Sequence, residues 1–151
     1  MNVTAKTDYA VRAVAELGAA GGKLVKADRI AQAQAIPRHF LDNILNELRR
    51  AGIVTTQRGA EGGSRLARPA KEVTLADVMR AMEGPLAAVR DVRPENLAYD
   101  GAAATLPQVW VAVRAALRNV LERVTVADLV AGRLPRSVER LLDDPEAWKP
   151  H

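Results

Sequence analysis

The residues with the clearest chemical potential lie in one stretch, RRAGIVTTQRGAEGGSRLARP, at positions 49–69. It contains five arginines, four glycines and one acidic residue, with two short β-prone segments on either side of the glycines. Arginine carries a permanent charge with planar donors that suit phosphate oxygens, and glycine lets the backbone approach a surface closely. The stretch predicts either an ordinary surface hairpin or a tip that contacts a polyanion. The neighbouring sequence decides between the two.

The positive charge is concentrated in the first half of the chain. Residues 1–72 contain 12 Lys and Arg against 7 Asp and Glu, a net charge of +5, whereas residues 73–151 contain 10 against 11, a net charge of −1. This asymmetry predicts a first unit that meets a polyanion and a second unit that meets protein. With 151 residues, about half of them apolar, the chain can bury one core and a small appendage.

Several function classes are excluded or disfavoured by composition. The chain has no cysteine, which excludes disulfides, thiolate metal sites and cysteine nucleophiles. It has neither a signal-like start nor an apolar run of ~20 residues, so we expect a cytoplasmic protein with no membrane partner. The GAEGG segment lacks the Lys-Ser/Thr of a phosphate-binding P-loop, and Asp143 and Asp144 have no catalytic companions nearby. We therefore expect no enzyme and no cofactor.

Three helices are predicted to position the arginines. Helical spacing from Ala10 to Gly18 predicts the first, and KADRIAQAQ at 26–34 predicts a short second helix. A turn at 35–37 leads into the third. Its predicted buried face consists of Phe40, Leu41, Ile44, Leu45 and Leu48.

Two short helices joined by a tight turn fit a helix-turn-helix, and a hairpin directly after them is a wing. The predicted strands of this hairpin are 53–57 and 64–68, joined by RGAEGG. A fourth helix, capped by Thr74 with Asp77 at its third position, closes a DNA-binding domain at residues 1–83. The similar segment at 123–132 is interpreted as the same capping solution used again.

The second half is predicted to sense and to dimerise. A long loop at 84–104 is the expected sensor region, and Thr105 with Gln108 predicts a capping box that opens the longest helix. The region 105–132 is expected to hold this dimerisation helix and a short following helix, and 133–151 to be a C-terminal tail. The predicted dimer seam on this helix consists of Leu106, Val109, Trp110, Val113, Leu117, Val120, Leu121 and Val124. These residues could instead pack wholly into the core of their own chain.

Together these features predict a mainly α fold: a winged helix-turn-helix domain with a two-stranded wing, followed by a long C-terminal dimerisation helix. The segments VTAKTDYAVRAV, IPRHFLDNILNELRRAGIV, RGAEGGSRLARP and VTLADVMRAMEGPLA resemble the Rrf2 family of bacterial winged helix-turn-helix transcriptional regulators, the group of the IscR, NsrR and CymR types. The likeness extends to about residue 132. It implies a dimer with the long helices crossed between subunits and a DNA-binding unit at each end.

One departure from the family concerns the metal cofactor. Iron–sulfur members carry three cysteines in the loop that here spans 84–104, and this loop has none. Asp8 resembles a position from which some members supply a further ligand, but it lacks companions, and neither His39 nor His151 lies in the loop. We therefore expect no iron–sulfur cluster.

The resemblance also implies residue roles in DNA binding. It places Pro37, Arg38, His39 and Asp42 at base edges, where Arg38 suits guanine and Asp42 a cytosine amino group. Asn43 is a weaker candidate for adenine. Because family members often have an aromatic residue where Ser64 stands, looser wing packing is expected. Each residue alone also fits an ordinary solvated surface position.

The wing and the flanking charges complete the predicted interface. Arg58 corresponds to the wing residue that enters the minor groove, with Gly59, Gly62 and Gly63 allowing the backbone to approach. The predicted phosphate contacts are Thr4, Lys6, Arg49 and Arg65.

The sequence thus predicts a sequence-specific transcriptional regulator, a homodimeric repressor that binds double-stranded operator DNA without a cluster. The alternative is a protein-interaction module that works through its C-terminal half and has lost DNA binding. An unknown small-molecule or protein effector is expected at the loop, unless the loop is only what remains after the cysteines were lost. The operator, the regulated genes, the signal and the choice between repression and activation stay open. The candidate effector residues are Arg90, Arg93, Asn96, Tyr99 and Asp100.

Overall fold

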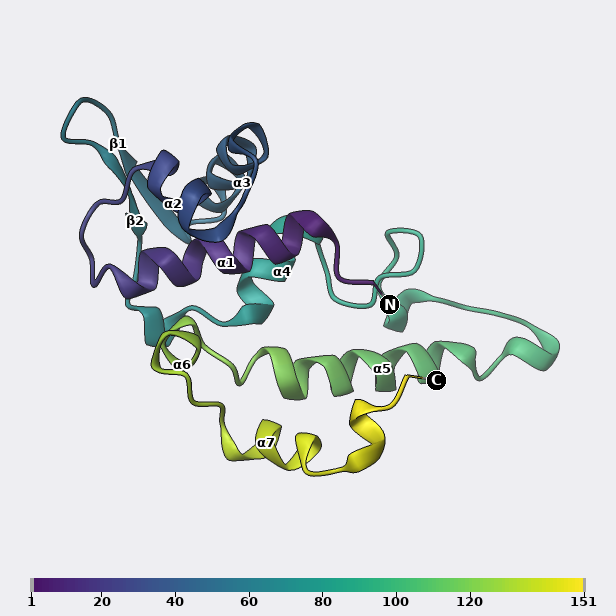
Figure 1. The fold of residues 1–151 in the computed structure, drawn as a ribbon. Helices are drawn as coiled ribbons and strands as arrows, with labels where there is room; N and C mark the ends of the chain where they lie inside the picture. The colour runs from purple at the N-terminus through teal and green to yellow at the C-terminus, as the bar shows by residue number, and fades with distance from the viewer. Residues whose placement is uncertain (1, 151) are drawn as a thin grey trace.

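The computed structural model describes residues 2–150, so Met1 and His151 lie outside the described residues. Its elements form two tiers (Figure 1), an upper one with α1 to α4 and the wing and a lower one with α5 to α7. This mainly helical architecture with one two-stranded antiparallel sheet confirms the predicted fold class. The elements are α1 (Ala5–Ala19), α2 (Ala27–Gln34), α3 (Arg38–Arg50), β1 (Val54–Gln57), β2 (Gly63–Leu66), α4 (Leu75–Glu83), α5 (Leu106–Leu121), α6 (Val126–Ala131) and α7 (Arg136–Leu142), with 3₁₀ turns at Ala70–Glu72, Pro94–Asn96, Gly101–Ala103 and Pro145–Trp148.

The core of the upper tier forms around α1. Leu17 of α1 is fully buried against a cluster that includes Ile30 of α2 and Leu48 of α3. Burying side chains of this kind stabilises the fold by about 1.5–3 kcal/mol each. The prediction that Phe40 lies in this core is wrong, because its side chain is 49% exposed and its ring packs beside Tyr9. The residue lies about 100° around the helix from Leu41, at the edge of the buried face.

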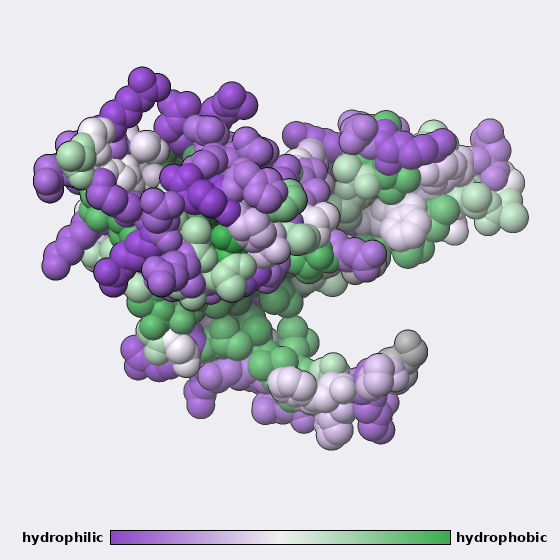
Figure 2. Space-filling model, turned by 45° about the horizontal axis from the view of Figure 1, so that its top comes forward, coloured by the Kyte–Doolittle hydropathy of each residue, from purple (hydrophilic) through white to green (hydrophobic). Residues whose placement is uncertain are grey.

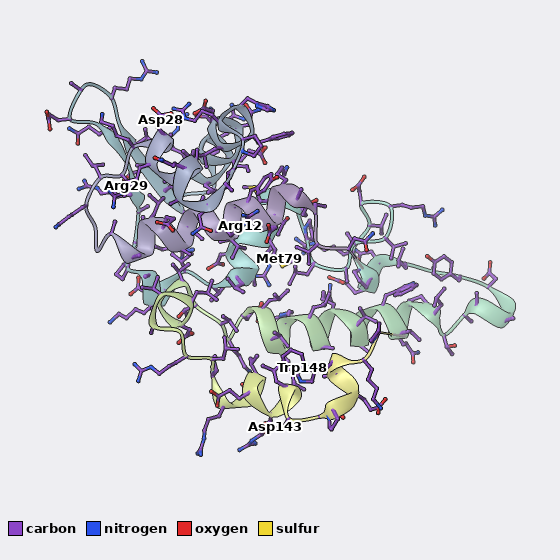
Figure 3. The ribbon with its side chains drawn as sticks, in the orientation of Figure 1. Arg12, Asp28, Arg29, Met79, Asp143 and Trp148 are labelled. Atoms are coloured by element: carbon purple, nitrogen blue, oxygen red, sulfur yellow. The ribbon has the colours of Figure 1, made fainter. Side chains whose placement is uncertain are left out.

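A side chain from α1 holds the turn of the helix-turn-helix. The helix α2 ends at Gln34 and is followed by Ala35, whose backbone is left-handed with φ 51° and ψ 45°. Arg12, labelled on α1 in Figure 3, donates from Nη1 to the carbonyl of Gln34 at 2.6 Å, while its Nη2 is paired with Asp8 at 2.7 Å. The charged group also lies 4.9 Å from the centre of the Tyr9 ring. Arg12 therefore satisfies a helix-end carbonyl and fixes α2 relative to α1.

The wing is anchored to the segment before α2. Val25 and Ser64 exchange two backbone hydrogen bonds of 2.8 Å beside the β1–β2 ladder. A Cβ at Gly63 would lie 2.7 Å from the carbonyl oxygen of Val25, and one at Gly62 would lie 2.2 Å from that of Gln57. These two glycines thus permit close backbone packing as well as any approach to DNA. Ser64 is only 3% exposed, so the base of the wing is closed rather than loosely packed.

The two similar capping segments meet in space. Both Thr74 with Asp77 and Thr125 with Asp128 form capping boxes, which confirms the shared capping solution. The two threonines also form an antiparallel bridge, which attaches α6 to the start of α4.

This bridge brings the segment that follows α5 against the upper core. Val126 of α6 is fully buried in that core, where a Cβ on Gly18 would lie 2.6 Å from its Cγ1. Val124, expected in the dimer seam, lies beyond the end of α5 and is 3% exposed, because it packs within its own chain.

Two further expectations in the second half differ from the structure. The predicted capping box at Thr105 is wrong: its side chain makes no capping bond, because its backbone is already helical and an N-cap requires an extended backbone. Pro107 lies in the first turn of α5, where its missing N–H costs no helical hydrogen bond. The expected C-terminal tail contains α7, and the indole N–H of Trp148 (Figure 3) donates to the carbonyl of Leu142 at 2.8 Å. Among residues 2–150, no helix has the length and apolar character needed to cross a membrane.

Candidate nucleic-acid interface

The outer face of α3 lies beside the wing at one end of the molecule (Figure 1). Because Leu41, Ile44, Leu45 and Leu48 point into the core, the opposite side of the helix is polar and exposed. An α-helix with its side chains is about 10–12 Å across, which matches the width of about 12 Å of a DNA major groove, and the 13 residues of α3 give it a length of about 20 Å along the groove. The exposed residues of this face are Arg38, His39, Asp42, Asn43, Asn46, Arg49 and Arg50.

Arg38, the predicted guanine reader, is held between two carboxylates. Its Nε lies 3.1 Å from Oδ1 of Asp28 on α2 (Figure 3), and its Nη1 lies 2.7 Å from Oδ2 of Asp42 one turn along α3. These two ion pairs engage Nε and Nη1 of Arg38 but not Nη2, so part of its five-donor guanidinium is not used by the carboxylates. The ion pair with Arg38 engages Oδ2 of Asp42 and links the two predicted base readers to each other. His39 stands beside them, its ring 4.3 Å from that of Phe40.

A hollow of about 450 Å³ lies between α3 and the wing, and its lining includes Lys26 and Asn46, which were not predicted to bind DNA. Asn46 lies four residues after Asp42 and on the same face of α3, so helical periodicity could have identified it. Lys26 donates from Nζ to the wing carbonyl of Ala60 at 2.6 Å and ties the start of α2 to the wing tip. No local pattern in the sequence indicates this contact, since 34 residues separate the partners.

The wing tip presents Arg58 and Gly59 to solvent. Gly59 has φ 105°, a backbone conformation that favours glycine, so the tight tip depends on this residue. Arg58 forms no ion pair with any residue between 2 and 150, which leaves its charge available. Arg65 is exposed on β2, on the same hairpin. The tip can therefore reach a DNA groove without breaking an internal ion pair.

Two of the predicted phosphate contacts have partners within the chain. Thr4 caps α1 by accepting from the backbone N–H of Thr7 at 3.1 Å, and its hydroxyl donates to Glu83 at 2.5 Å. The hydrogen bond from Thr4, together with one from Thr7, holds the pKa of Glu83 below its usual range. Lys6 is paired with Glu47 at 3.1 Å, whereas Arg49 is exposed. Arg49 is therefore the freer of the two cations.

The structure separates the residues predicted to bind an effector. Arg93 lines a pocket of about 540 Å³ between α4, the loop and α5, whereas Arg90 lines another hollow that faces the N-terminal segment. Asn96, Tyr99 and Asp100 follow along the loop, with only Tyr99 half-buried. The predicted set does not form one site, and Arg93 is the member that shares a pocket with three other arginines.

The apolar face of α5 is left partly uncovered within residues 2–150. No residue of this helix is fully buried, and Val109 and Val113 are 50% and 38% exposed. In the space-filling view of Figure 2, hydrophilic side chains dominate the upper left and hydrophobic ones gather below, toward the C-terminal arm. The half-buried members of the predicted seam are Leu106, Trp110, Leu117, Val120 and Leu121.

Comparison with known proteins connects this geometry to a function. A sequence model of the Rrf2 family, described as iron-dependent transcriptional regulator, matches residues 3–132. The protein Rv1287 of Mycobacterium tuberculosis, described as an HTH-type transcriptional regulator, is 49% identical over 148 residues, covering 97% of this chain and 92% of its own. The HTH-type transcriptional regulator CymR of Bacillus subtilis is 30% identical over 132 residues, covering 87% and 91%.

Solved structures agree with the sequence comparisons. The structure of CymR, the global cysteine regulator of B. subtilis, matches with a TM-score of 0.72 and 28% identity, over 87% of this chain and 98% of that chain. That of IscR from T. potens matches with a TM-score of 0.67 and 28% identity, over 100% and 93%. The chain is thus similar to bacterial regulators over nearly its whole length.

The iron in the family description does not fit the donors of this chain. There is no cysteine in the sequence, and among residues 2–150 no three His, Asp or Glu side chains gather as a group that could hold a metal ion. The residues present therefore do not fit a cysteine-ligated iron–sulfur cluster.

Proposed function

Since the chain belongs to the Rrf2 family and is a DNA-binding transcriptional regulator, we propose that it represses transcription as a homodimer on a two-fold symmetric operator, without an iron–sulfur cluster. The observation that carries this proposal is the exposed polar face of α3 beside a wing whose tip holds Arg58. Transcriptional regulators are not enzymes, and we propose no catalytic activity for this chain. The proposal also implies a cytoplasmic location, where bacterial operators are found.

In this arrangement α5 supplies the contact between subunits. Its uncovered apolar face would pack against the same face of a second copy, and each α3 would enter one major groove. Half-sites would then lie ~34 Å apart, one turn of DNA. Arg38 would read a base edge, Arg58 would enter the minor groove, and Arg49 and Arg65 would contact phosphates.

The loop at 84–104 would carry the regulation. It lies between the DNA-binding tier and α5, so a ligand bound there could alter how the two recognition helices match their half-sites. Deleting residues 90–100 while the dimer is preserved tests this role. Unchanged operator affinity in vitro, together with unchanged induction in cells, would instead indicate a constitutive repressor.

Selection of DNA fragments by the purified protein tests the DNA-binding proposal. We expect recovery of a short palindromic site, bound with an affinity that falls steeply with salt concentration, because phosphate contacts release counterions. Arg58→Gln should weaken this binding and relax the preference for A·T pairs beside the palindrome. Arg133→Gln, the same charge change at an exposed residue after α6, is the matched control. Failure to recover a site, with no salt-dependent binding, would favour the protein-interaction alternative.

A further inference from the structure

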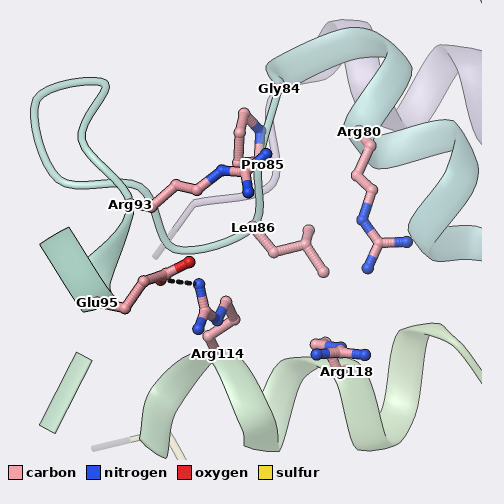
Figure 4. A pocket seen from close by; sticks show the side chains of 8 residues that line it. All are labelled: Arg80, Gly84, Pro85, Leu86, Arg93, Glu95, Arg114 and Arg118. Carbon is pink, nitrogen blue, oxygen red and sulfur yellow. Dashed lines mark hydrogen bonds and ion pairs between the residues drawn. The ribbon is translucent and has the colours of Figure 1, made fainter. Parts of the chain in front are cut away.

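A pocket rich in arginine lies between the two tiers of the molecule (Figure 4). Its upper wall comes from α4 and the segment that follows, one side from the loop, and its floor from α5. The pocket has a volume of about 540 Å³. The residues that line it are Arg80, Gly84, Pro85, Leu86, Arg93, Glu95, Arg114 and Arg118.

The cations in this pocket outnumber the carboxylates that neutralise them. Glu95 is paired with Arg114, as the dashed line in Figure 4 shows. Glu122, at the end of α5, accepts from both Arg80 and Arg118, the latter at 2.9 Å. Four guanidinium groups thus face two carboxylates, a surplus of two positive charges. The ion pairs formed among residues 2–150 do not include Arg93.

Both carboxylates are held in their charged form, so protonation does not add to the surplus at neutral pH. The hydrogen bond from Arg80, followed by that from Arg118, lowers the pKa of Glu122. The pKa of Glu95 is lowered first by a hydrogen bond from its own backbone and then by Arg114. The excess of two positive charges is therefore a stable property of the pocket.

Guanidinium groups gathered from separate elements repel one another, and a bound anion would offset that repulsion. Their planar donors match the oxygen pairs of carboxylates and phosphates, and such charge-assisted hydrogen bonds are about twice as strong as neutral ones. We propose that this pocket binds a small molecule carrying two anionic groups, carboxylates or phosphates, and that this molecule is the effector of the regulator. The effector role rests on the proposed function, whereas anion binding by itself does not.

The position of the pocket explains how an anion would affect DNA binding. Arg80 belongs to α4, which packs on α1 and α3, while Arg114 and Arg118 belong to α5, the proposed dimer helix. An anion held by all three arginines would fix one orientation of the upper tier relative to α5. It would change operator affinity to the extent that it binds this orientation more tightly than others. Operator phosphates are not the proposed occupant, because α3 and the wing lie on the side of the upper tier that faces away from α5 (Figure 1).

Calorimetric titration of the protein without DNA tests the pocket directly. The probes are pyrophosphate and citrate, with acetate as a monoanion, all at one ionic strength set with sodium chloride. Arg93→Gln is the informative variant because it removes a lining charge without breaking an ion pair, and Arg133→Gln is the matched control. We expect saturable binding of pyrophosphate or citrate but not acetate, with the Kd raised about tenfold by Arg93→Gln alone. The preferred probe identifies the phosphate or carboxylate class.

Operator binding then tests the effector role. The bound probe should change operator affinity in the unaltered protein and much less in Arg93→Gln. Absence of saturable binding, or equal weakening of anion binding by Arg93→Gln and Arg133→Gln, would overturn the proposal that the pocket binds anions. Saturable binding with unchanged operator affinity would overturn the effector role. If no operator exists, the titration without DNA still decides whether the pocket binds anions, so failure of the proposed function is recognised separately.

Discussion

The uncovered face of α5 allows a quantitative prediction for the double substitution of Val109 and Val113 by alanine. Each change removes two methyl groups, worth about 0.8 kcal/mol apiece when fully buried. Only the exposed fractions, 50% and 38%, remain to be buried by a partner. The loss is then about 1.4 kcal/mol per chain and about 2.8 kcal/mol per dimer, which raises the Kd of dimerisation about a hundredfold.

Sedimentation equilibrium over a wide range of protein concentrations measures this change. The fold should survive, because neither side chain is fully buried within one chain and alanine favours a helix. Circular dichroism and thermal unfolding check that point. The control is Val92→Ala, a valine that is 40% exposed but lies in the loop. An unchanged dimer Kd, or an equal change in the control, would refute the assignment of α5 as the dimer contact.

Four further outcomes are expected. Arg38→Ala should cost about 1–3 kcal/mol of discrimination at one base pair, whereas Arg49→Ala should weaken binding to all DNA sequences alike and reduce the salt dependence of the affinity by about one phosphate contact per subunit. Binding to a panel of altered sites distinguishes the two effects. Uniform weakening by both variants would remove Arg38 as a base reader. Ala35→Gly should stabilise the fold by roughly 0.5–1 kcal/mol in urea unfolding, because glycine adopts φ 51° without strain; a loss of stability would count against this reasoning. The pKa of Glu83 is lowered in the fold, so its ionised form adds stability above its ordinary pKa of about 4.3, and this contribution is lost as the pH falls through the lower folded pKa. Glu83→Gln should therefore make the urea concentration at the unfolding midpoint depend less on pH over this acidic range. An unaltered pH dependence would contradict the assignment. The purified protein should be colourless and bind its selected DNA without added iron, because it has no cysteine; visible absorption with stoichiometric iron would refute this.

Most of the DNA-binding unit was predictable because its signals are local. Helical spacing placed α1 to α3, and the glycines after α3 placed the wing. The Thr-x-x-Asp segments predicted their own capping boxes, since donor and acceptor lie three residues apart. Local signals failed where the neighbouring backbone overrode them, as at Thr105, which already has helical backbone angles.

The sequence by itself determined α1 to α6, the wing, the basic first half and the absence of cysteine ligands. Periodicity and turn chemistry depend on residues close together in the chain, and composition depends on no structure at all. Only the tertiary structure decided that Asp28 and Asp42 clamp Arg38, that Val124 is buried within its own chain, and that the expected tail contains α7. It also brought together four arginines spread over positions 80–118. Such contacts depend on how helices pack, and packing is set by the shape and burial of side chains far apart in the chain, which no local pattern records.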